Sequence, residues 1–530
     1  MGKVMTKKIF ILFVIAAVFI LVGLLLNRNP GKVTIIPKVK DLVIEDNPLY
    51  IENIRKQDYP GSAITITQTL SSGVNYKRYI ASYSSDNLKI YGLYTVPNAV
   101  PGENGYPVIV LLHGYLDPKT YITTQRYVAY QDQLARNGFV TFKPDLRGHG
   151  ESEGEAMQAN FSTGYVTDTL NLISSLQKEE IVNPEKIGIW GHSMGGGIAL
   201  RTMVTTDKIK AAVIWAGVVG TYEDLLDRYR NRVPWVRNDL IEKYASPSVN
   251  PAFWNKVDPY TYFESLTTPI ALHHTVEDES VPVEFSRNLK TKLESLGKSV
   301  EYFEYQNSDH NLSNPAFGLA MDRTVAFFKK HLQEPAFIAE TPFISQAPYG
   351  EWKDPRHQDG CEEAATLIAV SWAKTLDLDK DIAKREILSA SGFQSQKYGE
   401  YRDTSAADTA QRLLKEYFRF ENFKVEKEVT LPRLVEILKS GKIIVAPTNG
   451  RVLRNPGYTP PGPERHMVVI LGYDPQTREF ITHDPGVGNG AYYRYPKEVL
   501  YNAIRDYSTG YHIPITETLK NVIIVSHEAG

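Results

Sequence analysis

Hydrophobic and polar positions alternate between two periods from about residue 85 to residue 332. Short, nearly continuous apolar runs predict buried strands, and the segments between them repeat apolar residues at helical spacing. Strands that alternate with helices predict a buried, mostly parallel, doubly wound sheet. The expected strands are residues 88–96, 108–112, 140–143, 187–190, 211–215, 270–274 and 300–305. The expected helices are residues 126–136, 165–176, 195–205, 285–296 and 315–331.

The pattern changes after His331, where Pro and Glu interrupt any periodicity and predict a linker over residues 334–341. A second domain is expected over residues 342–530. Its helices come first and its strands later, which predicts an α+β fold. The helical signals are residues 362–376, 406–418 and 431–438, and the strand signals are 442–446, 467–473, 479–482 and 522–526.

One apolar run differs from all others in length. Residues 9–26 carry no charge and follow Lys3, Lys7 and Lys8, which predicts a transmembrane helix within residues 1–30 and a cytoplasmic N-terminus. No small-residue cleavage site follows, so an uncleaved signal anchor is favoured over a removed signal peptide. Residues 31–60 are then expected to be a spacer, with both folded domains outside the cytoplasm.

Composition narrows the class of protein. A chain of 530 residues with 42% hydrophobic and 23% charged residues predicts two or three globular domains. The net charge of -2 and the lack of a Lys/Arg block argue against a nucleic-acid partner. The single cysteine, Cys361, excludes an intramolecular disulfide, so this residue needs another explanation. Oligomeric state has no signal in the sequence.

A nucleophile motif joins the predicted strand 187–190 to the next helix. Gly191-His192-Ser193-Met194-Gly195 matches G-x-S-x-G in the strand-turn-helix context that this motif requires. The turn at Ser193 is so tight that larger side chains at Gly191 and Gly195 would collide, and the serine oxygen is left exposed. Ser193 is therefore the expected nucleophile.

A serine nucleophile needs a base and an acid that orients the base. Asp278 follows the strand 270–274 and is the expected acid, with Glu277 as a neighbouring competitor. His310 follows the strand 300–305 and is the expected base. The backbone N–H groups of Tyr115, in the loop after strand 108–112, and of Met194 are the expected oxyanion donors.

These elements resemble the catalytic domain of prolyl-oligopeptidase-type α/β-hydrolases. The resemblance rests on His113-Gly114, the loop at 145–152, the Ser193 motif, Asp278 with Val281-Pro282, and His310. It covers about residues 85–332 and implies an α/β-hydrolase fold, predicted as a domain over residues 61–333, that cleaves peptide or ester bonds through an acyl-enzyme. Residues 217–266 form an aromatic-rich insertion, read either as a lid over the site or as a unit packed on itself.

Cys361 lies where an apolar helix is predicted to begin, and a helix N-terminus favours the thiolate. Glu362 and Glu363 oppose this effect unless they point to solvent. His466, at the head of the strand 467–473, is the best candidate base, and Asp484 follows the next strand. Each also has an ordinary structural interpretation: a small buried hydrophobe, a strand-end residue and a turn former.

Together, Gln346, Cys361, His466 and Asp484 resemble the papain-like cysteine peptidases related to the bacteriocin-leader (double-glycine) peptidases. The resemblance implies a cysteine nucleophile, a histidine base, an aspartate that orients the imidazole, and Gln346 as an oxyanion donor.

Neither domain is expected to need a cofactor. A metal site is not expected either, because the chain has no cysteine pair or H-E-x-x-H motif, and the adjacent His273 and His274 should point to opposite faces of their strand.

The sequence thus predicts a membrane-anchored hydrolase with a serine site and a second, cysteine site. Two alternatives stay open. In the first alternative, the serine enzyme is a carboxylesterase. In the second, the cysteine domain is inactive and binds peptide or envelope polymer.

Overall fold

The structure is a computed structural model that describes residues 46–102, 104–157, 159–228 and 234–528. The predicted transmembrane run at residues 9–26 lies outside these ranges. No helix within the described ranges is long and apolar enough to cross a membrane.

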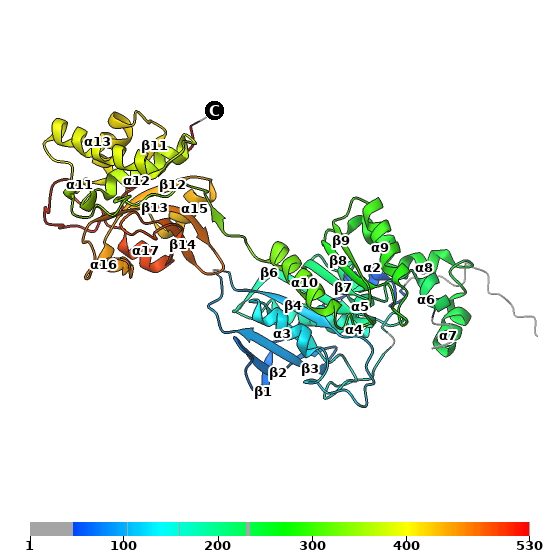
Figure 1. The fold of residues 1–530 in the computed structure, drawn as a ribbon. Coiled ribbons are helices and arrows are strands. Elements are labelled where there is room, and N and C mark those ends of the chain that lie inside the picture. Colours follow the sequence, from blue (N-terminus) through cyan, green and yellow to red (C-terminus); the bar gives the residue numbers. More distant parts are fainter. Residues whose placement is uncertain (1–45, 103, 158, 229–233, 529–530) are drawn as a thin grey trace, which may run out of the picture. The chain divides into compact units, whose positions relative to one another are not determined.

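A nine-stranded mixed sheet forms the centre of the hydrolase domain (Figure 1). Its order is β1-β2-β3-β5-β4-β6-β7-β8-β9. The six strands from β5 to β9 run parallel, as predicted, whereas β1, β2 and β3 join one edge in antiparallel register. The strands are β1 (Thr65–Leu70), β2 (Tyr76–Ser85), β3 (Leu88–Pro97), β4 (Tyr106–Leu112), β5 (Val140–Pro144), β6 (Val182–His192), β7 (Ile209–Trp215), β8 (Ile270–Thr275) and β9 (Val300–Tyr305).

Helices cover both faces of this sheet. α3 and α10 pack together on one face, α4 and α5 pack together and against its strands, and α9 packs on β8 and β9. Alternate residues of the parallel strands, such as Ile109 and Leu111 of β4, enter the core under α3 and α10. The helices are α3 (Val128–Arg136), α4 (Gly164–Leu176), α5 (Met194–Met203), α9 (Val283–Ser295) and α10 (Ala316–Leu332).

The expected insertion forms a compact unit of its own. The described part of this unit comprises residues 46–54, 221–228 and 234–261. Tyr244 and Phe253 stack with ring centroids 4.0 Å apart, and Tyr50 packs on Phe253 at 5.6 Å. The Asn47 side chain donates to the Tyr244 hydroxyl. The helices are α2 (Ile51–Lys56), which continues beyond the unit, α6 (Tyr222–Arg228), α7 (Pro234–Tyr244) and α8 (Pro251–Val257), with η2 (Pro259–Ser265) at the border.

Part of the segment expected as a spacer is therefore folded. Ile51 and Ile54 of α2 are fully buried, and this short helix begins inside the residue range 31–60 that was predicted to be a spacer. Aromatic side chains of the insertion pack on one another.

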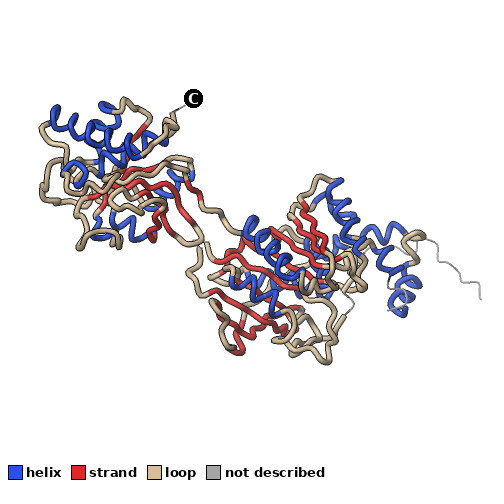
Figure 2. Tube along the Cα trace, viewed as in Figure 1, coloured by secondary structure: helices blue, strands red, loops and turns tan. Residues whose placement is uncertain are grey.

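The C-terminal domain is built on a seven-stranded antiparallel sheet (Figure 2), which is compatible with the α+β expectation. Its order is β11-β16-β12-β13-β14-β15, with β10 paired to β13. The strands are β10 (Phe337–Ile338), β11 (Phe423–Glu426), β12 (Ile443–Thr448), β13 (His466–Asp474), β14 (Glu479–His483), β15 (Tyr493–Pro496) and β16 (Val522–Val525).

Both faces of this second sheet are buried. Met467 and Val469 of β13 pack under α12, whereas Val468 and Ile470 pack with α15. The apolar run at 467–473 is continuous for this reason. The helices are α11 (Pro355–Gln358), α12 (Cys361–Ala373), α13 (Lys380–Tyr398), α14 (Ala406–Thr409), the π-helix η3 (Ala410–Tyr417), α15 (Leu431–Lys439), α16 (Gly450–Leu453) and α17 (Lys497–Ala503).

Candidate active sites

Ser193 occupies a strained turn between β6 and α5. Its backbone angles, φ 54° and ψ -118°, lie outside the regions that side chains favour. The Ser193 N–H donates to the Trp215 carbonyl at 3.0 Å, and its own carbonyl accepts from Gly196 and Val218. These bonds to three neighbouring segments hold the strained conformation, which is the way proteins retain such geometry at functional sites.

The two motif glycines are required by close backbone approach. A Cβ atom on Gly191 would lie 2.4 Å from the Gly195 carbonyl oxygen. One on Gly195 would lie 2.0 Å from the carbonyl oxygen of Leu112, at the end of β4. Both separations are shorter than any real contact, so only glycine allows the elbow to sit against the neighbouring strand.

Asp278 and His310 lie together at the ends of β8 and β9. The His310 Nδ1 is 2.7 Å from the Asp278 Oδ2, and the Asp278 Oδ1 accepts the backbone N–H groups of Ser280 and Val281. Burial would raise the pKa of the Asp278 carboxyl, but hydrogen bonds from His274, His310 and Val281 outweigh it and hold the pKa well below its usual range. Asp278 is therefore an ionised acceptor for the imidazole.

The competing acid, Glu277, makes different contacts. Its carboxylate accepts the Thr275 hydroxyl at 2.9 Å and the Asn307 N–H at 3.1 Å, so it ties the loop after β8 to the loop after β9. Asp278 is the neighbour that contacts His310.

His192 links His310 to the elbow. The Gly114 N–H donates to the Tyr127 hydroxyl, so this hydroxyl donates its own proton to the His192 Nδ1 at 2.7 Å. The His192 Nε2–H then donates to the His310 carbonyl at 2.9 Å. Burial lowers the pKa of His192 to about 3, which keeps the ring neutral and this direction of donation fixed. Tyr127 and His192 were not predicted as site residues.

The loop after β4 lies beside the nucleophile. A Cβ atom on Gly114 would lie 3.1 Å from the Ser193 Cβ. The next residue is Tyr115, whose side chain is exposed. Among the described residues, neither the Tyr115 N–H nor the Met194 N–H has a hydrogen-bond acceptor. Both groups are thus free to bind an oxygen near Ser193.

His274 is a further contact of the acid that sequence reasoning missed. Its Nε2 lies 3.1 Å from the Asp278 Oδ2. The adjacent His273 instead contacts the Tyr305 hydroxyl and packs on Trp215, so the two histidines point to opposite faces, as predicted.

In the C-terminal domain, Cys361 is the first residue of α12, at the helix N-terminus as expected. Its thiol is buried and donates to the Glu362 Oε2 at 3.0 Å. The Glu362 Oε1 accepts the Tyr507 hydroxyl at 2.9 Å and the Thr404 N–H at 3.3 Å. Burial and the charge of Glu362 raise the pKa of the Cys361 thiol well above its ordinary value. The two glutamates do not point to solvent, so in this arrangement the thiol keeps its proton.

His466 and Asp484 are joined by a short hydrogen bond at the ends of β13 and β14. The His466 Nε2 lies 2.7 Å from the Asp484 Oδ1, and both side chains are buried. Burial would raise the pKa of the Asp484 carboxyl, but His466 and two tyrosine hydroxyls lower it below its ordinary value. Its Oδ2 accepts three donors that were not predicted, namely Asn455, Tyr458 and Tyr495.

A cavity of about 560 Å³ contains Cys361, His466 and Gln346 in its wall. The Gln346 amide nitrogen donates to the carbonyls of His357 and Gln358, each at 2.9 Å. Two acceptors fix the orientation of this amide and use both of its N–H bonds. Gln346 therefore lines the same cavity as Cys361, but its amide is not free to donate to an oxyanion in this arrangement.

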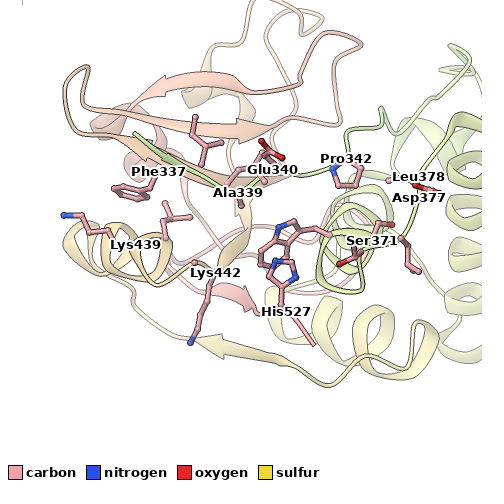
Figure 3. Close-up of a pocket in the computed structure, with 17 residues that line it drawn as sticks. Phe337, Ala339, Glu340, Pro342, Ser371, Asp377, Leu378, Lys439, Lys442 and His527 are labelled. Carbon is pink, nitrogen blue, oxygen red and sulfur yellow. The ribbon is translucent and has the colours of Figure 1, made fainter. Parts of the chain in front are cut away.

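A second cavity, of about 700 Å³, lies elsewhere on the C-terminal domain (Figure 3). Residues of the linker and β10, such as Phe337 and Glu340, form one side, and Lys439, Lys442 and His527 contribute to the others. None of the predicted site residues lines it.

Comparison with known proteins separates the same two domains. Residues 125–335 match the prolyl oligopeptidase family, and residues 338–509 match the Peptidase_C39 like family. The uncharacterized peptidase YtmA of Bacillus subtilis is 27% identical over 241 residues, which cover 45% of this chain and 88% of that protein. The putative esterase YitV of Bacillus subtilis is 24% identical over 242 residues, which cover 43% of this chain and 89% of that protein.

Among solved structures, the Pyrococcus horikoshii acylaminoacyl peptidase matches with a TM-score of 0.41 and 22% identity, over 49% of this chain and 42% of that chain. The chain thus spans less than half of that peptidase. A serine hydrolase is indicated by the prolyl oligopeptidase family match, by the two relatives and by the turn at Ser193. The chain contains a serine hydrolase domain of the prolyl oligopeptidase family, followed by a Peptidase_C39-like domain.

Proposed function

We propose that this protein cleaves peptide or ester bonds with Ser193 as nucleophile, His310 as base and Asp278 as the acid that orients it. The observation that carries the proposal is the 2.7 Å contact between the His310 Nδ1 and the Asp278 Oδ2. The backbone carbonyl of His310 is in turn held by the His192 ring of the Ser193 elbow. Attachment to a membrane through residues 9–26 is part of the proposal and rests on the sequence alone.

The chemistry follows from these positions. The Ser193 Oγ attacks the carbonyl carbon while its proton passes to the His310 Nε2, and the ionised Asp278 stabilises the resulting imidazolium. The N–H groups of Met194 and Tyr115 bind the oxyanion. His310 then protonates the leaving amine or alcohol, and water repeats the sequence to release the acid from the acyl-enzyme.

The choice between peptide and ester substrates is open in this proposal, because both reactions use the same groups. One relative carries the name of a peptidase and the other that of an esterase. Parallel assays of the whole chain on peptide and ester libraries decide between them. Hydrolysis of esters alone would favour the carboxylesterase alternative.

The serine assignment is tested with a fluorophosphonate probe. Wild-type protein is expected to be labelled, and Ser193→Ala is expected to lose labelling completely. Asp278→Asn should be labelled far more slowly, since the amide cannot stabilise the imidazolium. Undiminished labelling of Ser193→Ala would refute the proposal.

We further propose a second hydrolytic site in which Cys361 attacks a peptide bond, His466 is the base and Asp484 orients its ring. The short contact between His466 and Asp484 in the wall that also contains Cys361 supports this site. His466 presents its Nε2 to Asp484, which leaves the Nδ1 for the thiol.

The bond from the Cys361 thiol to Glu362 supports the competing interpretation, in which this domain only binds peptide or envelope polymer. A peptidyl epoxide distinguishes the two. An active site reacts quickly at Cys361 and loses this reaction in His466→Ala, but keeps it in His512→Ala, an exposed histidine of the same cavity. Equal, slow modification of all three proteins would favour the binding module.

A further inference from the structure

His274 lies behind the acid of the serine site, and its ring is completely buried at the end of β8. The His274 Nε2 lies 3.1 Å from the Asp278 Oδ2, which is the oxygen that also contacts His310. The same Nε2 lies 3.1 Å from the Val281 carbonyl, and the Nδ1 lies 2.8 Å from the Ser286 hydroxyl of α9. Both ring nitrogens are therefore held.

The partners fix where the proton sits on this ring. Asp278 and the Val281 carbonyl offer only acceptor oxygens to the Nε2, so the Nε2 carries the hydrogen. The Ser286 hydroxyl, in contrast, is able to donate to an unprotonated Nδ1. The Nε2–H of His274 therefore points at the Asp278 carboxylate.

We propose that His274 is a positioning residue that, through its Nε2–H, holds the Asp278 carboxylate in the orientation that His310 requires. This role rests on the proposed function of Ser193, Asp278 and His310. Without His274, backbone N–H groups still hold the Oδ1 of Asp278. The Oδ2 would then have a single side-chain partner, His310, and the carboxylate could rotate more freely.

The electrostatic effect has a definite sign. The His274 N–H offsets part of the negative charge of the Asp278 carboxylate that faces His310. Other charged or titratable groups near His274 are Glu304, its partner on β9, Arg287, which pairs with Glu304, and His192. A substitution at position 274 leaves these groups in place. Loss of the N–H should therefore strengthen the attraction between this carboxylate and a protonated His310 imidazole.

His273 provides a matched control. It is the preceding residue of β8 and is equally buried, but its ring contacts Tyr305 and not Asp278. A general loss of packing in the strand should affect His273 and His274 variants alike. A positioning role should appear at His274 only.

The experiment measures the fluorophosphonate labelling rate of the whole chain across pH 5 to 9, with thermal unfolding in parallel. His274→Leu is expected to label about tenfold more slowly at the plateau. The pH at which its labelling rate falls to half of the plateau on the acidic side, the acid midpoint, should be higher than in wild type. His274→Gln, which restores an N–H donor, is expected to recover most of the rate and the midpoint. His273→Leu should lower the unfolding temperature without moving the midpoint.

The outcomes separate the two proposals. Absence of labelling in wild type, or labelling that survives Ser193→Ala, overturns the serine site itself. Wild-type labelling that depends on Ser193, together with an unchanged rate and midpoint in His274→Leu, overturns the role of His274 alone. An equal midpoint shift in His273→Leu also overturns it.

Discussion

Ser193 and Cys361, the two proposed nucleophiles, lie in contrasting surroundings. In the serine site, the Asp278 carboxylate accepts hydrogen bonds from the Val281 N–H and from the rings of His310 and His274. These donors stabilise its negative charge and fix its orientation. The thiol of Cys361 instead faces a buried carboxylate, which stabilises the protonated form. The position of Glu362 thus decides how reactive Cys361 is.

Glu362→Gln should increase the reactivity of Cys361. The Oε1 accepts two donors, so the glutamine oxygen takes that place and its NH₂ group faces the sulfur. A donor in place of a carboxylate lowers the thiol pKa, and a thiol pKa that is lower by about 1 gives about a tenfold larger thiolate fraction. The rate of iodoacetamide alkylation at neutral pH should rise, and its midpoint should fall to lower pH.

Glu363→Gln is the control, because this neighbouring glutamate bonds Gln394 and not the thiol. Alkylation that is unchanged in Glu362→Gln, or that rises as much in Glu363→Gln, would contradict the role given to Glu362.

At the scale of elements, the serine site depends on how closely α5 approaches β4. Gly195 allows this approach, since a Cβ atom at this position would meet the backbone of Leu112 and His113. The parallel strands themselves could be predicted, because burial on both faces makes their apolar runs continuous. The edge strand β1 could not, because its side chains are largely exposed and mostly polar.

Gly195→Ala should destabilise the hydrolase domain. The new methyl group would lie 2.0 Å from the Leu112 oxygen, a backbone atom that cannot move without β4. We expect a loss of more than about 2 kcal/mol in the free energy of unfolding, measured with urea. Gly318→Ala in α10 is the control, since nothing lies within 4 Å of its Cβ position. That variant should gain about 0.5 kcal/mol, and an equal loss in both variants would contradict the packing explanation.

At the scale of the whole molecule, three of the buried histidines of the hydrolase domain have a pKa far below the ordinary value. Burial lowers the pKa of His113, His192 and His273 to about 3 in each case. An unfolded chain protonates them near pH 6.5. Folded protein therefore binds fewer protons between these values, so their contribution to stability is complete above about pH 6.5 and is lost progressively as pH falls towards 3.

The unfolding temperature of the protein should accordingly decrease between pH 7 and pH 5, where most carboxylates are still ionised. His273→Phe removes one of these groups, so its unfolding temperature should depend less steeply on pH, whatever its absolute stability. Scanning calorimetry at several pH values checks both expectations. A flat profile over this range in wild type would contradict them.

The sequence by itself predicted the parallel strands and the order of the two domains, and it proposed Ser193, Asp278, His310, Cys361, His466 and Asp484 as site residues. Of these, the structure places Asp278 against His310 and Asp484 against His466. Short motifs and the ends of apolar runs carry this information locally. The sequence left α13 unrecognised, because few residues of that helix are buried and its pattern is weakly amphipathic. Residues 51–56, expected as spacer, likewise form a short helix in which only Ile51 and Ile54 are buried, too few apolar positions to predict it from the sequence.

Only the tertiary structure decided which groups surround the proposed nucleophiles. The contacts of Tyr127 with His192 and of Tyr458 with Asp484 join residues 65 and 26 positions apart, so no local pattern announces them. The direction in which Glu362 points was also undetermined, because a glutamate at a helix N-terminus can face solvent or the core. Such contacts cannot be predicted locally because their partners lie far apart in the sequence. Burial then determines the protonation of the groups that meet, and so their chemical effect.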